Sequence, residues 1–152
     1  MSRRSIKDKQ KENKDLRLLL LSLYKVSNIR VLYLAPIEES LREAILRCIR
    51  TESFVAKRRY EREAVNLLRE EDEEGIQFLE DIPSNIAELQ LSLERDIQLW
   101  IKRLEDPEEL GTFCDQHPHL NIQKIRQFLR SKKEKHRKAL FNVLEGILFP
   151  VE

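Results

Sequence analysis

The segment NIAELQLSLERDIQLWIKRL, residues 85–104, places apolar side chains three or four positions apart along its whole length. At about 100° per residue, this spacing gathers them on one face of an α-helix. Ser84 or Asn85 is suited to cap this helix, and Pro83 is expected to end a shorter helix over residues 76–82. The apolar face comprises Ile86, Leu89, Leu93, Ile97, Trp100 and Leu104.

The composition extends the helical pattern to the whole chain of 152 residues. Hydrophobic residues make up 41% and charged residues 36%, and there are only three Gly and five Pro. A chain with so few helix breakers and so many charged residues at helical spacing favours an all-α fold. We expect a multihelical protein of about six to eight helices without a sheet. We expect two small lobes, over residues 1–82 and 83–152.

Capping residues predict where the other helices begin and end. Ser5 with Asp8 resembles an N-terminal cap, and the first helix is expected to reach about Tyr24. Pro36 suits the first turn of the next helix. Residues 26–35 are rich in β-favouring side chains but have no strand partner, so they are either a helix continuation or a packed connector.

Further breaks are expected in the rest of the chain. A weak break near Ser53 starts a helix that the acidic stretch at 72–75 ends. Asp106 and Pro107 begin a short helix that ends near His117, and Asn121 caps the last basic segment.

The net charge of +1 conceals a strong segregation of charge. Residues 1–17 carry seven basic and three acidic side chains, whereas residues 70–81 carry seven acids and no base. A second basic cluster comprises Lys57, Arg58, Arg59 and Arg62. This asymmetry indicates one surface that attracts anions and another that repels them.

The most basic segment is IQKIRQFLRSKKEKHRK, residues 122–138, with eight Lys or Arg residues and one acid. Read as one helix, it aligns Ile122, Ile125 and Leu129 on an apolar stripe. Lys132 and His136 fall on that stripe too, so the helix is expected to break there or to leave the core. The adjacent stripe holds Arg126, Arg130, Lys133 and Arg137.

The basic stripe has two possible interpretations. A charged stretch is most often a solvated helix face, and that interpretation stays open. However, we find no acid four residues from these bases that would pair with them, and a stripe of like charges favours an anionic partner. Because Lys accompanies Arg, we expect contacts with the phosphate backbone of duplex-like RNA or DNA rather than base reading.

No enzyme or cofactor motif is present. The chain lacks nucleophile-elbow, Walker A and HExxH patterns. Cys114, His117 and His119 are too few for a structural zinc site, and a zinc enzyme is the least favoured hypothesis. The two cysteines form no CxxC pair, and the apolar run Leu18–Leu21 is far too short to span a bilayer. We therefore expect a cytoplasmic protein without cofactor or membrane partner.

Three groups of residues, in this order, resemble the YjgA/DarP family of bacterial ribosome-associated proteins over most of the chain. The first is PIEESLREAI at residues 36–45. The second is KRR at 57–59 followed by NLLR at 66–69. The third is IRQFLRSKKEK at 125–135 followed by ALF at 139–141.

This resemblance implies a non-enzymatic, all-helical assembly factor that acts on late precursors of the large ribosomal subunit and aids maturation of the peptidyl-transferase region. The implied partners are 23S rRNA, the precursor particle and ribosomal proteins, with a monomer when free. The positions that match the family, with a proposed role in contacting rRNA phosphates, are Arg58, Arg59, Arg126, Arg130, Lys132, Lys133 and Lys135. The basic clusters add Arg62, Arg137 and Lys138 to the expected RNA-binding set.

An alternative from another class remains open. The chain would then be a helical protein-interaction module whose basic stripe docks an acidic protein, or the acidic stretch at 70–81 of a second copy.

Overall fold

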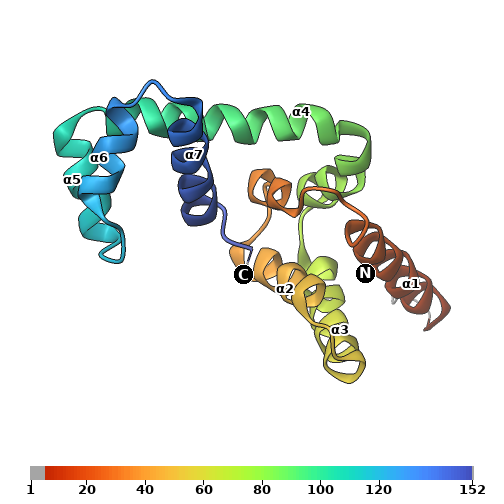
Figure 1. Cartoon of the computed structure of the whole chain (residues 1–152). Helices are drawn as coiled ribbons and strands as arrows, with labels where there is room; N and C mark the ends of the chain where they lie inside the picture. The colour runs from red at the N-terminus through yellow and green to blue at the C-terminus, as the bar shows by residue number, and fades with distance from the viewer. Residues whose placement is uncertain (1–5, 152) are drawn as a thin grey trace. The chain divides into compact units, whose positions relative to one another are not determined.

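The structure is a computed structural model, drawn in Figure 1. It describes residues 6–151, and of residues 6–9 only the backbone. Over this range the chain forms seven α-helices and one 3-10 helix, with no strand, as the sequence predicts. None of these helices combines the length and the apolar character needed to cross a membrane.

The chain divides into two compact units, one reaching residue 90 together with Val151 and one over residues 91–150. Helix α4 (Glu73–Leu104) contributes to both units. The sequence placed the lobe boundary at 82/83, and those two lobes stay a prediction. The first unit holds α1 (Ile6–Leu23), the 3-10 helix η1 (Ile29–Leu34), α2 (Glu39–Arg50) and α3 (Phe54–Glu70). The second holds α5 (Pro107–Gln116), α6 (Ile122–Arg130) and α7 (Glu134–Leu148).

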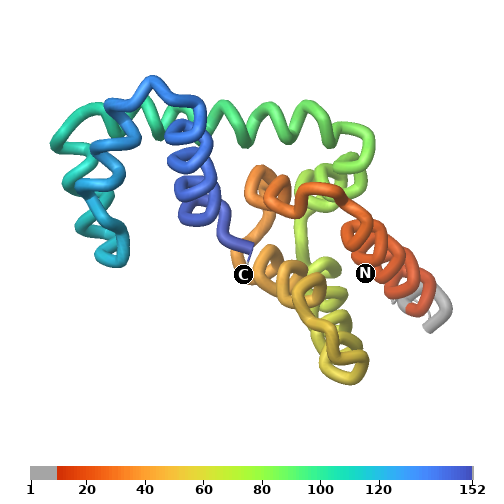
Figure 2. Tube along the Cα trace, in the orientation of Figure 1, coloured from red at the N-terminus to blue at the C-terminus, as the bar shows by residue number. Residues whose placement is uncertain are grey.

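In the first unit, α3 packs against both α1 and α2 (Figure 2). Each of these helices contributes one apolar stripe to a common core. Leu20 of α1, Ile45 of α2 and Leu68 of α3 are almost completely buried. Burying a side chain of this size stabilises the fold by about 1.5–3 kcal/mol, so these contacts dominate the packing.

The second unit has its own core, to which α4, α5, α6 and α7 all contribute. Trp100 of α4 lies against Phe113 of α5, with their ring centroids 5.5 Å apart. Helices α6 and α7 pack side by side as an antiparallel hairpin, as Figure 1 shows. The buried core side chains are Ile97, Leu104, Leu110, Phe113, Ile125, Leu140 and Leu144.

Pro83 lies inside α4, so the prediction that it separates two helices is wrong. Proline removes one backbone donor and strains the preceding turn, at a cost of about 3 kcal/mol. Leu79 and Ile82 on that turn are fully buried, and their burial offsets this cost. Gly75 also lies in α4, whereas α3 already ends at Glu70. A Cβ at position 75 would meet Ile37 at 3.0 Å, so the close approach favours glycine there.

Pro36 precedes α2 instead of lying in its first turn. The backbone around it stays extended because Arg42 donates hydrogen bonds to the carbonyls of Leu32 (3.1 Å) and Ala35 (3.2 Å). Residues 26–35 are a packed connector, in which η1 buries Val31 and Leu32. The cap expected from Ser5 and Asp8 lies outside the described side chains.

The predicted cap at Asn121 is confirmed, and the helix starts predicted near Ser53 and Asp106 also have side-chain caps. The side chains of Ser53, Asp106 and Asn121 accept hydrogen bonds from backbone N–H groups in the first turns of α3, α5 and α6. Each satisfies donors that have no partner inside the helix.

Leu144→Ala should lower the free energy of unfolding by about 2–5 kcal/mol, because it opens a cavity among fully packed side chains. The matched control is Leu99→Ala, which removes the same atoms from a side chain that is 64% exposed and should change stability by less than about 0.5 kcal/mol. Urea titration followed by fluorescence of Trp100, the single tryptophan, measures both. Equal effects would contradict this core.

Candidate nucleic-acid interface

The basic segment 122–138 forms two helices, so the four bases of the stripe do not lie on one continuous helix. The break lies at residues 131–133, where the sequence allowed one. The Ser131 hydroxyl oxygen accepts a hydrogen bond from the Lys133 backbone N–H (3.1 Å) and lies 2.6 Å from His136 Nδ1. Breaking here keeps Lys132 off the apolar stripe, and α7 can then turn back along α6.

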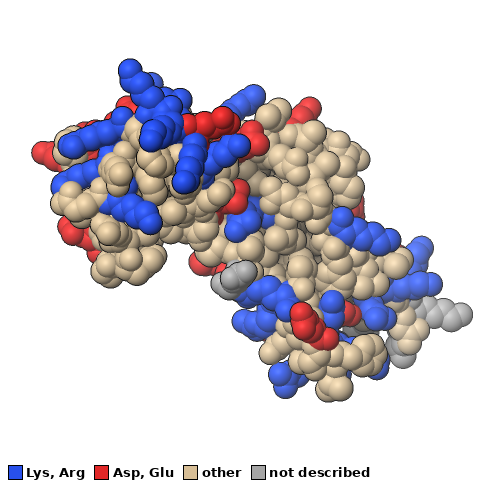
Figure 3. Space-filling view, in the orientation of Figure 1, with Lys and Arg blue, Asp and Glu red and all other residues tan. Residues whose placement is uncertain are grey.

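The break concentrates positive charge at the end of the α6–α7 hairpin. We name Lys132, Lys133 and Lys135 the turn cluster. All three are exposed, and none forms an ion pair with another described residue. Figure 3 shows Lys and Arg side chains gathered over this turn.

Glu134 is the one acid of the segment, and it forms an exposed ion pair with Lys138 at 3.5 Å. The expectation that no base here has an acid four residues away is therefore wrong at Lys138. An exposed pair of this kind contributes at most about 0.5 kcal/mol, so it neutralises little of the turn.

The four bases of the predicted stripe separate into different surroundings. Arg126 and Arg130 border a pocket of about 250 Å³ that Glu105 also lines. Arg137 borders another pocket, of about 490 Å³, beside Lys102. Lys133 belongs to the turn cluster.

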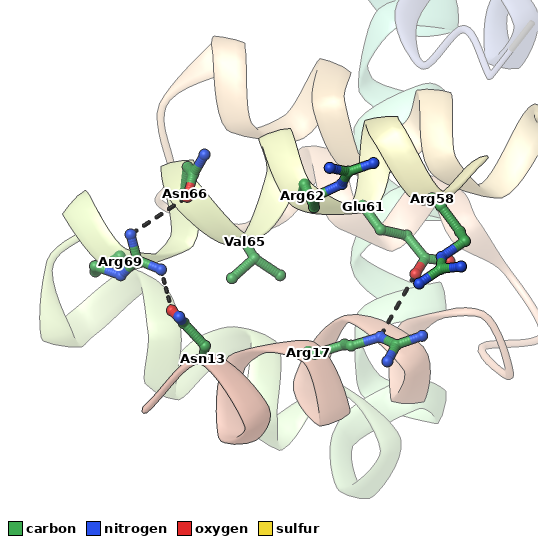
Figure 4. Close-up of a pocket in the computed structure, with 8 residues that line it drawn as sticks. All are labelled: Asn13, Arg17, Arg58, Glu61, Arg62, Val65, Asn66 and Arg69. Atoms are coloured by element: carbon green, nitrogen blue, oxygen red, sulfur yellow. Dashed lines mark hydrogen bonds and ion pairs between the residues drawn. The ribbon is translucent and has the colours of Figure 1, made fainter. Parts of the chain in front are cut away.

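A second basic surface lies in the first unit, as a groove between α1 and α3 (Figure 4). We name it the α1–α3 groove, and its volume is about 370 Å³. It is lined by Asn13 and Arg17 of α1 and by Arg58, Glu61, Arg62, Val65, Asn66 and Arg69 of α3.

The structure divides the predicted cluster at residues 57–62. Arg58 and Arg62 line the groove together, because residues four apart share a helix face. Arg59 does not line it, and its guanidinium lies 5.3 Å from the Tyr60 ring centroid. Lys57 lies over the ring of Tyr24, at 4.5 Å.

Glu61 forms the buried side of the groove and is only 9% exposed. Its Oε1 accepts a hydrogen bond from the Tyr24 hydroxyl at 3.0 Å, and its Oε2 lies 3.7 Å from Arg17 Nε. Burial, with smaller contributions from Cys48 and Glu61, raises the pKa of Tyr24 well above its usual range. The phenol therefore stays protonated and available to donate.

Asparagines hold the other end of the groove. Arg69 donates to the side-chain oxygens of Asn66, at 3.3 Å, and of Asn13. Sequence reasoning missed Arg69, although residues 58, 62 and 69 share a helix face at 100° per residue. It also missed Asn13 and Arg17, for which no local signal exists because they come from another helix.

The cysteines and histidines form no recognisable metal site. Among the described residues, no group of three or more His, Cys, Asp or Glu side chains is arranged to hold a metal ion. Both cysteines are free thiols, and burial raises the pKa of Cys48 to about 11. Cys48 therefore stays protonated at neutral pH and is a poor nucleophile.

Glu61→Gln should lower the free energy of unfolding by about 1.5–3 kcal/mol, because it removes the charge from hydrogen bonds at a buried position. Glu63→Gln on the same helix is the control. That side chain is 52% exposed and pairs with Arg47 at 3.6 Å, so its loss should change stability by less than about 1 kcal/mol. Thermal unfolding followed by helical circular dichroism compares them, and a larger loss at Glu63 would contradict the role given to Glu61.

The family model described as dual-action ribosomal maturation protein DarP matches residues 1–145. No curated protein and no solved structure gives a significant match. The matched range runs through all the helices as far as Glu145 of α7, and so includes both basic surfaces. The family expected from the sequence is confirmed: the chain belongs to the DarP family of ribosomal maturation proteins.

Proposed function

We propose that this protein is a non-enzymatic ribosome biogenesis factor that binds rRNA of late large-subunit precursors through basic helical surfaces. The turn cluster is the observation that carries this proposal. Three exposed lysines within four positions repel one another, and no described acid pairs with them. A polyanion removes this repulsion, and the family's role in ribosomal maturation makes rRNA the relevant polyanion.

The chemistry of the two surfaces supports contact with phosphates. The turn cluster consists of lysines, which act as mobile point charges and position a backbone without reading bases. Around it we assign Arg126, Arg130, Arg137 and Lys138 as further contacts. In the first unit we assign Arg58, Arg59 and Arg62. The proposed partner is 23S rRNA in the precursor particle, where binding aids maturation of the peptidyl-transferase region. The protein acts in the cytoplasm, contacts ribosomal proteins as well, and is a monomer when free.

The triple variant Lys132→Gln, Lys133→Gln, Lys135→Gln should release the protein from precursor large subunits in a sucrose gradient. It removes three charges without touching a buried side chain. The matched control is Ser84→Asp, Asn85→Asp, Ala87→Glu at exposed positions of α4, which lowers the net charge by the same three units. The control should stay with the particles.

Two outcomes would overturn the assignment. One is unchanged co-sedimentation of the turn variant. The other is a complex that survives RNase treatment intact, which would favour the protein-docking alternative.

Binding to rRNA fragments should weaken steeply with salt, because each phosphate contact releases counterions. Removing the three turn lysines should lower the slope of log affinity against log salt by about 2 to 3, at about 0.7–0.9 per contact. Fluorescence anisotropy at several potassium chloride concentrations measures the slope for the wild type, the turn variant and the α4 control. An unchanged slope in the turn variant would show that these lysines do not contact phosphate.

A further inference from the structure

We propose that the α1–α3 groove, with Phe54 at one end, is a binding site for unpaired nucleotides of single-stranded RNA. The choice of RNA rests on the function proposed above. The mode of binding is different, since duplex-like RNA met at the turn cluster is recognised through its backbone alone.

The charge balance of the groove favours an anion. Four arginines and one carboxylate line it, and both oxygens of that carboxylate, Glu61, are already engaged by Tyr24 and Arg17. Arg58 and Arg62 form no ion pair with a described residue, so both can take a phosphate. In Figure 4 both side chains extend from α3, and Arg58 lies beside Glu61 at one end of the groove.

Phe54 adds a surface on which a base can stack. It lies in the first turn of α3 with 73% of its surface exposed, and the Arg58 guanidinium is 5.7 Å from its ring centroid. At 100° per residue, positions 54, 58, 61, 65 and 69 fall within about 80° of arc, so Phe54 continues the face that lines the groove. An aromatic ring beside a basic groove is the arrangement used by proteins that bind single strands.

The far end of the groove offers hydrogen bonds of both kinds. The side-chain amides of Asn13 and Asn66 contain donors and acceptors, and Arg69 contributes further donors. Such groups can pair with a base edge or a ribose 2′-hydroxyl, which distinguishes RNA from DNA. An acidic peptide without aromatic or aliphatic side chains would leave the Phe54 ring without a partner.

The size of the groove selects an unpaired nucleotide over a duplex. Its volume of about 370 Å³ falls within the ~300–1,000 Å³ typical of sites for small organic ligands. A groove of this volume can hold a base and its phosphate, whereas a base-paired duplex is too large to enter it.

The test measures binding of the full chain to a ten-nucleotide single-stranded RNA and to an RNA duplex of the same length, by fluorescence anisotropy. Phe54→Ala should weaken single-strand binding by about 5- to 150-fold and leave duplex binding unchanged. Phe54→Tyr should restore single-strand binding, because a phenol ring stacks as well. Phe54 is exposed, so these variants should fold like the wild type, which circular dichroism checks.

The groove arginines have a matched control, an arginine on another helix. Arg58→Gln with Arg62→Gln should lower the single-strand salt slope by about 1.4, at ~0.7 per contact. Arg95→Gln removes the charge of an exposed arginine on α4, outside the groove and outside the assigned RNA contacts, and should leave single-strand affinity almost unchanged.

Several results would overturn the groove site. These are an unaffected Phe54→Ala variant, an equal loss of duplex and single-strand binding, an Arg95→Gln effect equal to that of Arg58→Gln with Arg62→Gln, or displacement of the RNA by poly-glutamate at equal charge concentration. Failure of the proposed function would give a different set of results. There, the turn variant would remain on precursor particles while the Phe54 and Arg58 variants still lose single-stranded RNA.

Discussion

Burial of one narrow apolar stripe per helix is the constraint on which this fold depends. More than a third of the side chains are charged, and the described chain has no sheet to supply a hydrogen-bonded framework between segments. Each helix must therefore pair its stripe with another helix, and its remaining faces stay exposed and charged. The same constraint explains why functional groups can occupy so much of the surface without disturbing the core.

Local signals in the sequence were sufficient to predict a helix end where a single side chain determines that end. Asn121 and Asp106 cap their helices because a short polar side chain reaches nearby N–H groups whatever the tertiary structure. Pro83 shows where this reasoning fails. Its effect on the backbone is local, but the burial of Leu79 and Ile82 that offsets it depends on partners distant in sequence. Likewise the periodicity of 122–138 identified the break only as an option, and the packing of α7 along α6 decides it.

The candidate site was predictable to the extent that it lies on one helix. Arg58 and Arg62 were found from their charge, and helical spacing identifies Arg69 as their neighbour. The groove itself needs α1 beside α3, and no pattern within either helix indicates which faces meet. Glu61 illustrates the same limit. In the sequence it is one of many glutamates, whereas in the structure it is the only buried charged side chain among the described residues.

The two basic surfaces differ in the conformational freedom of their Lys and Arg side chains. At the turn, flexible lysines face water with nothing to orient them. In the groove, Arg17 and Arg69 are already held in place by Glu61 and the asparagines, so ordering them on binding loses less conformational entropy. An incoming phosphate, however, has to share Arg17 with the carboxylate beneath it. In the nucleotide site proposed for the groove, Glu61 thus competes with the phosphate for Arg17, and this competition shortens the residence time of a bound nucleotide.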